Sequence, residues 1–118
     1  MDQIYSITID GLKASVSHCK WKGHSLHFVY SLEYLQRLAP WVIQVDAPLL
    51  VSFYDDRRVQ ISQVSIPLDI DGFFLEQITT QWQTVIQVTA PKKTVRFFTV
   101  ALGGSSLVVS FVEIPSAD

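Results

Sequence analysis

The stretch that decides the fold is residues 94–114, in which residues 94–102 read TVRFFTVAL and residues 107–114 read LVVSFVEI. The two apolar runs flank Gly103-Gly104-Ser105-Ser106, a connection that is typical of a β-hairpin. Regular antiparallel pairing predicts these cross-strand pairs: Leu102 with Leu107, Val100 with Val109, Phe98 with Phe111, and Arg96 with Glu113.

Both faces of this predicted hairpin are apolar, because Phe98 and Phe111 fall on one face while Phe97 and Val112 fall on the other. A hairpin that needs cover on two sides belongs in a sandwich or barrel, or at a subunit interface. Phe97, Phe98, Phe111 and Val112 are therefore the candidate interface residues. Either a second sheet of the same chain or a second copy can cover the remaining face, and the second copy is favoured.

The composition indicates one domain, residues 1–118, with few charges for its surface. Hydrophobic residues make up 48% of the 118 residues and charged residues only 17%, which favours a protein partner and a homo-oligomer. The net charge of −2 provides no basic field for a phosphate backbone, so we expect no nucleic-acid partner.

The remaining sequence predicts a mainly β, antiparallel fold, a curved sandwich or partly open barrel of seven to nine strands with one or two short helices, and an α+β fold as the alternative. The expected strands are 5–9, 12–20, 24–30, 41–45, 49–54, 59–66, 82–89 and the C-terminal pair. Lys22-Gly23 is the expected turn of the second hairpin. The helices are expected at 32–39 and 73–81.

Burial favours pairing Phe53 with Val59 and Val51 with Ile61 in the hairpin that spans residues 49–66. The apolar phase then slips by one residue, which predicts a β-bulge near Ser62-Gln63.

Few residues suggest chemistry. Catalytic and phosphate-binding motifs do not occur in the sequence, so we expect neither an enzyme nor a cofactor. The Lys22-Gly23 turn would place His18 opposite His27, a weak candidate pair for a metal, because Cys19 would point to the other face and no further ligand is evident. Trp21, beside the same turn, is the candidate for stacking against a ligand, whereas Trp41 and Trp82 are expected in the core.

These observations support two functional hypotheses. The first is a non-enzymatic interaction or assembly module (an adaptor, an apparatus or virion component, or a protein inhibitor) that acts through apolar sheet surface. The alternative is a domain that binds a small ligand or carbohydrate in an aromatic-lined cup. The sequence contains no membrane-spanning apolar run, and its single cysteine, Cys19, excludes an internal disulfide, so a cytoplasmic protein without a membrane partner is expected.

Overall fold

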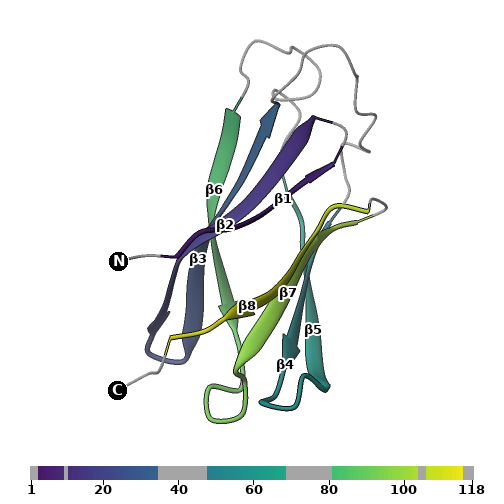
Figure 1. Cartoon of the computed structure of the whole chain (residues 1–118). Helices are drawn as coiled ribbons and strands as arrows, with labels where there is room; N and C mark the ends of the chain where they lie inside the picture. Colours follow the sequence, from purple (N-terminus) through teal and green to yellow (C-terminus); the bar gives the residue numbers. More distant parts are fainter. Residues whose placement is uncertain (1–2, 10, 35–47, 69–80, 104–105, 116–118) are drawn as a thin grey trace.

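The computed structural model describes residues 3–9, 11–34, 48–68, 81–103 and 106–115. These residues contain no helix, and their strands are β1 (Tyr5–Ile9), β2 (Leu12–Lys22), β3 (Ser25–Tyr34), β4 (Leu49–Tyr54), β5 (Gln60–Ile66), β6 (Gln81–Thr89), β7 (Phe97–Leu102) and β8 (Val108–Glu113). The strands form two antiparallel four-stranded sheets that pack face to face (Figure 1). The predicted antiparallel sandwich is confirmed.

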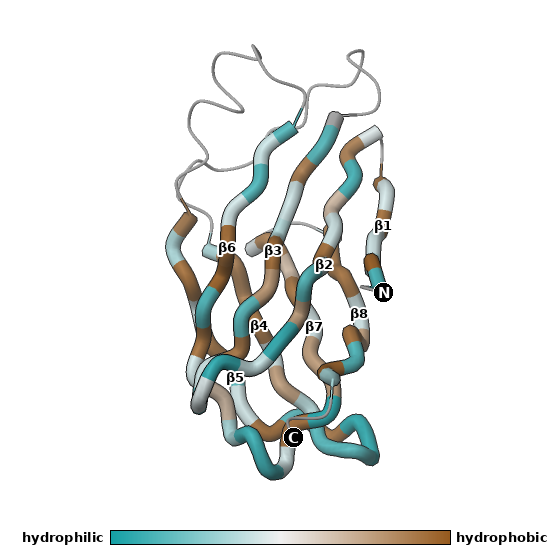
Figure 2. The backbone as a smooth tube through the Cα atoms, turned by 90° about the vertical axis from the view of Figure 1, so that its left-hand side faces the viewer, coloured by the Kyte–Doolittle hydropathy of each residue, from teal (hydrophilic) through white to brown (hydrophobic). Residues whose placement is uncertain are grey.

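The first sheet has the strand order β1-β2-β3-β6 and the second has the order β5-β4-β7-β8. Strands β1 and β2 lie against β8, so β6 and β5 form the opposite side of the sandwich (Figure 2). The chain crosses between the sheets after β3, β5 and β6.

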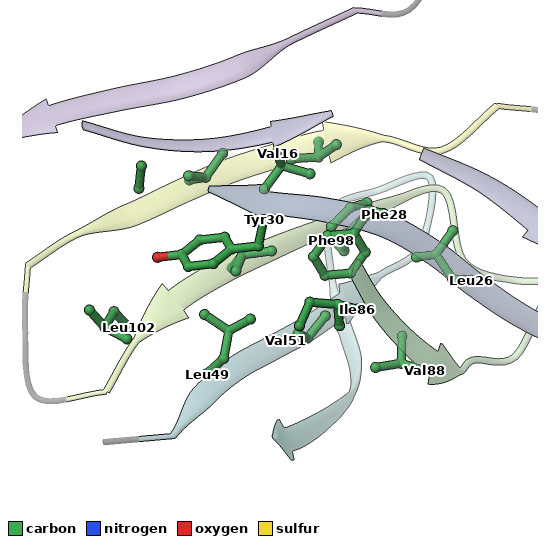
Figure 3. Packing of buried hydrophobic residues seen from close by; sticks show 14 of the residues in the cluster. Val16, Leu26, Phe28, Tyr30, Leu49, Val51, Ile86, Val88, Phe98 and Leu102 are labelled. Carbon is green, nitrogen blue, oxygen red and sulfur yellow. The ribbon is translucent and has the colours of Figure 1, made fainter. Parts of the chain in front are cut away.

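The core forms because alternate residues of each strand point between the sheets. Phe28 of the first sheet and Phe98 of the second have ring centroids 5.0 Å apart (Figure 3). The Phe98 centroid is 6.4 Å from that of Phe53. Trp82 is half-buried and packs edge-on against Tyr30, with centroids 6.5 Å apart. The interior between the described strands is therefore filled by aromatic and aliphatic side chains.

The C-terminal hairpin has the predicted register near its turn and a different one at its open end. Val100 pairs with Val109 as predicted, and the Leu102 N–H donates to the Leu107 carbonyl. The predicted Phe98–Phe111 and Arg96–Glu113 pairs are wrong, because Phe98 pairs with Val112 and Phe97 with Glu113. A bulge at Ser110-Phe111 causes the shift. It turns Val112 and Ile114 into the core and leaves Glu113 exposed.

A bulge also shifts the register between β2 and β3. The turn residues of the β2–β3 hairpin are Gly23 and His24, one position later than predicted, and Gly23 has a φ of 64°. A positive φ at the first turn position suits glycine. The bulge at His18-Cys19 then places Lys20 opposite His27, so the predicted His18–His27 pair is wrong.

The predicted pairing of β4 with β5 is wrong, since Val51 pairs with Val64 and Phe53 with Ser62. The expected bulge is present, but it lies at Ile61, one residue before the predicted position. Residues 31–34 belong to β3 rather than to the helix expected at 32–39, and Gln81 begins β6. The remainder of both expected helices, the expected strand 41–45 and Trp41 lie outside the described residues.

Candidate interaction surface

The candidate interface residues of the C-terminal hairpin divide between the inside and the outside of the sandwich. Phe98 and Val112 are fully buried, and the Phe28 ring of the first sheet covers Phe98. They belong to the core of a single chain. Phe97 and Phe111 are only partly buried and lie on the outer face of the second sheet. The surface worth considering is therefore this outer face.

Phe97 and Phe111 form an aromatic cluster with Tyr54. The Phe111 centroid is 5.2 Å from that of Tyr54 and 6.5 Å from that of Phe97, which it meets edge-on. The guanidinium carbon of Arg58 lies 4.7 Å from the Phe111 centroid and 5.3 Å from the Phe97 centroid. These distances are typical of cation–π contacts, so one cation covers two rings.

The turn between β4 and β5 holds Arg58 in place. The Asp55 carboxylate accepts hydrogen bonds from the N–H groups of Arg57 and Val59, both at 2.9 Å. The Arg58 N–H donates to the Asp55 carbonyl at 3.0 Å, and Asp55 and Val59 close the loop through a 3.0 Å backbone bond. This geometry requires a left-handed residue at position 58, and Arg58 has a φ of 61°. Glycine usually occupies such a position.

Phe111 also has a left-handed backbone, with a φ of 47° in the β8 bulge. The bulge moves its ring from the inner to the outer face, where it meets Arg58. Only one other non-glycine residue of the described chain, His18, has a positive φ. Two of these strained residues therefore contact each other. Strained residues cluster at functional sites, so this contact marks the aromatic cluster as a candidate site.

The outer faces of the two sheets differ in chemistry. The central strands of the first sheet alternate buried residues with mainly polar outward ones: Lys13, Ser15, Ser17, Lys20, His27, Ser31 and Glu33 (Figure 2). The central strands of the second sheet, β4 and β7, contain no charged residue, and their outward positions are Leu50, Ser52, Tyr54, Phe97, Thr99 and Ala101. Such an apolar outer face is typical of a surface that a partner covers.

Two polar side chains of this outer face are already buried by their neighbours. Ser52 is 6% exposed and accepts a 3.0 Å hydrogen bond from the Gln63 amide. Thr99 is 8% exposed, and its hydroxyl lies 3.5 Å from the Tyr54 hydroxyl. Because these groups are paired within the chain, covering them with a partner leaves no unsatisfied hydroxyl.

The other sequence candidates lie elsewhere. His18 is exposed in the β2 bulge, and its ring nitrogen Nδ1 is 3.0 Å from the Ser17 hydroxyl. Within the described residues no three His, Cys, Asp or Glu side chains gather as metal ligands would. Lys92 lies over the Trp21 ring, 5.8 Å from its centroid, and donates to the Gly23 carbonyl. One face of the stacking candidate is therefore occupied by a side chain of the same protein.

Cys19 and Tyr30 carry the perturbed groups of the first sheet. The β2 bulge turns Cys19 inward beside the core, and burial raises the pKa of its thiol to about 12. Burial also raises the pKa of Tyr30, whose hydroxyl has no hydrogen-bond partner among the described residues. Both groups are thereby kept in their neutral forms, and neither is activated for nucleophilic chemistry.

Comparisons of this chain with known protein families, with curated proteins and with solved structures find no match. In the part of the chain that the structure describes, no helix is long and apolar enough to cross a membrane.

Proposed function

We propose that this protein is a non-enzymatic assembly module, which binds a second copy of itself through the outer face of the second sheet. One observation carries the proposal: Arg58 and Phe111, both in strained conformations, stack on each other in an aromatic cluster on a sheet face whose central strands, β4 and β7, carry no charged residue. The low charge content of the sequence also favours a surface that a partner covers.

The residue types of the cluster suit a protein interface. Tyr and Arg are enriched among the residues that dominate binding energy, and aromatic side chains in general are enriched at interfaces. Phe97 and Phe111 supply apolar area, while the guanidinium of Arg58, held over their rings, retains N–H donors for a carbonyl or carboxylate. The cluster thus combines an apolar anchor with a directed polar group.

A second copy fits this face because charges of both signs lie at its margin, outside the uncharged strands β4 and β7. Arg58 lies over the Phe97 and Phe111 rings, while Glu113, opposite Phe97, is exposed beside them. A two-fold arrangement pairs the same patch on two copies, so Arg58 of each copy can meet the Glu113 carboxylate of the other. A cytoplasmic setting belongs to the same proposal, and the lone cysteine supports it.

The ligand-binding alternative has less support. The alternative expects an aromatic-lined cup, but the large aromatic side chains Phe28, Tyr30, Phe53 and Phe98 are buried between the sheets. Between the described strands these side chains occupy the space that a small-molecule site in the cup would need.

Sedimentation velocity over a range of protein concentrations tests the proposal. Phe111→Glu places a carboxylate in the cluster, and we expect it to abolish one association step while the far-UV circular dichroism stays unchanged. Ser15→Glu adds the same charge to the outer face of the first sheet and serves as the matched control, which we expect to associate like the wild type. If Phe111→Glu and Arg58→Gly both remain folded and associate like the wild type, the proposed face is not the binding surface.

A further inference from the structure

The edge strand β6 differs from the other three edges of the sandwich. Natural sheets protect their edges with short strands, charges, prolines or bulges. Strand β1 has only 5 residues. Strand β8 has a bulge and a glutamate, and β5 has a bulge at Ile61. Strand β6 has none of these devices.

Strand β6 has 9 residues, Gln81–Thr89, and pairs with β3 in an unbroken register from Ser25–Thr89 to Glu33–Gln81. The whole stretch between Glu76 and Lys92 contains no charged residue. In the strand order, β6 has a neighbour on one side only among the described strands. With respect to the described strands, its other side therefore presents a regular, uncharged row of backbone donors and acceptors, which is a template for another strand.

The side chains of β6 are symmetric about its centre. Val85 is the middle residue of Gln81–Thr89 and is 66% exposed. An antiparallel pairing of two copies centred there places Gln83 opposite Gln87 and Gln81 opposite Thr89 on the outer face. On the inner face the same register pairs Trp82 with Val88 and Thr84 with Ile86. Polar residues thus meet polar ones outside, and every inner pair contains an apolar side chain.

We infer that β6 is a second self-association site, in which two copies pair their β6 strands antiparallel about a two-fold axis at Val85. The pairing joins the two first sheets into one continuous sheet, β1-β2-β3-β6-β6-β3-β2-β1. Because neither strand carries a charge, two identical copies meet without like-charge repulsion. The inference rests on the edge alone and does not depend on the aromatic cluster.

The expected contact is small. A 9-residue strand is about 31 Å long at ~3.4 Å per residue, so a β6 edge about 10 Å thick contributes ~300 Å² per copy. Strand β5, with 7 residues, lies on the same side of the sandwich and adds a shorter strip of ~240 Å². The sum of about 550 Å² is below the ~800 Å² per partner of a standard interface, so we expect a reversible, concentration-dependent dimer.

The geometry of this dimer complements the proposed function. When residues of the same face pair across an antiparallel dyad, the two-fold axis is perpendicular to the sheet. Both second sheets then lie on the same side of the joined sheet, and both aromatic clusters point the same way. Such a dimer is bivalent for further copies, as an assembly module requires.

An engineered disulfide tests the axis directly. In Val85→Cys the two introduced cysteines would face each other with Cα atoms about 5 Å apart, a separation that a disulfide spans. Gln81→Cys is the matched control on the same face of the same strand. Its symmetry mate is 8 residues away along the pair, about 27 Å, so it cannot cross-link within the dimer.

We expect mild oxidation to convert Val85→Cys, but not Gln81→Cys, into a covalent dimer, as judged by non-reducing electrophoresis at protein concentrations that allow association. The Phe111→Glu background isolates the edge, and there Val85→Lys is expected to turn a sedimenting dimer into a monomer. Equal cross-linking of both cysteine variants, or no cross-linking of Val85→Cys in a folded protein, overturns the inference. Neither of those results bears on the proposed aromatic interface, which is tested separately by adding Phe111→Glu to the Val85→Lys variant.

Discussion

Replacing Arg58 by glycine and by alanine separates two opposing contributions of the same residue. Alanine removes the guanidinium but keeps the left-handed backbone at a φ of 61° strained. Glycine removes both the guanidinium and the strain. The cation–π contacts to Phe97 and Phe111, at 5.3 Å and 4.7 Å, stabilise the fold by about 0.5 kcal/mol each at an exposed site. The left-handed conformation costs about 1 kcal/mol in a residue with a Cβ atom.

Arg58→Ala is therefore expected to lower the free energy of unfolding by about 1 kcal/mol, and Arg58→Gly to leave it unchanged within about 0.5 kcal/mol. Urea unfolding followed by circular dichroism measures both values, because a difference of 1 kcal/mol moves the midpoint by about 0.5 M for a urea slope near 2 kcal/mol/M. The protein concentration must be low, since association stabilises the folded state.

Arg57 provides the control for this pair. It lies in the same turn and is also exposed, but its φ is not positive. Arg57→Gly is expected to be no more stable than Arg57→Ala, the reverse of the order at position 58. Equal stabilities of Arg58→Ala and Arg58→Gly would refute the strain argument, and a gain above about 1 kcal/mol in Arg58→Gly would show that the cation–π contacts contribute nothing.

Adjacent phenylalanines of β7 test the division between core and surface: Phe98→Ala should cost about 3–5 kcal/mol of unfolding free energy because Phe98 is fully buried, whereas Phe97→Ala should cost about 1 kcal/mol. Equal losses in urea unfolding would contradict the assignment of Phe97 to the outer face. Cys19 should react with a thiol reagent at pH 8 at least ten times more slowly in the folded protein than in urea, because burial raises its pKa to about 12 and suppresses the thiolate. The same shift makes the free energy of unfolding depend on pH. The stabilisation from the raised pKa is fully present below the unfolded pKa of about 9. It is lost as the pH rises from about 9 to 12, because in that range only the unfolded chain ionises its thiol. A Cys19→Ser variant should lack this component of the alkaline loss, and an unchanged pH profile would exclude it.

The sequence by itself determined the class of the fold. Alternation of apolar and polar residues identified β1, because one face of the strand must be removed from water. Apolar runs on either side of a glycine-containing turn identified the strands of the β2–β3 and C-terminal hairpins. The two apolar faces of the C-terminal hairpin also predicted an apolar surface. The pairs nearest its turn, such as Val100 with Val109, follow from connection length alone.

The tertiary structure decided which hairpin residues are core and which form the candidate site. A regular β8 would turn Phe111 and Glu113 toward the core, whereas the bulge buries Val112 and Ile114 and leaves Glu113 in solvent. The same logic applies to β2, where the buried positions pass from Val16 to Cys19. In both strands the apolar spacing lengthens from two residues to three at the bulge, a signal that sequence reasoning could have used.

Only the folded chain brings Arg58 to Phe111, because the two residues lie in different hairpins and meet across β4 and β7. Their left-handed conformations are unfavourable for each residue alone, so no local propensity predicts them. The cost is offset by burying Val112 and Ile114 on one side of the sheet and by stacking the guanidinium on two rings on the other. These gains come from residues distant in sequence, and this is why the sandwich could be predicted from alternation while its candidate binding surface required the packed structure.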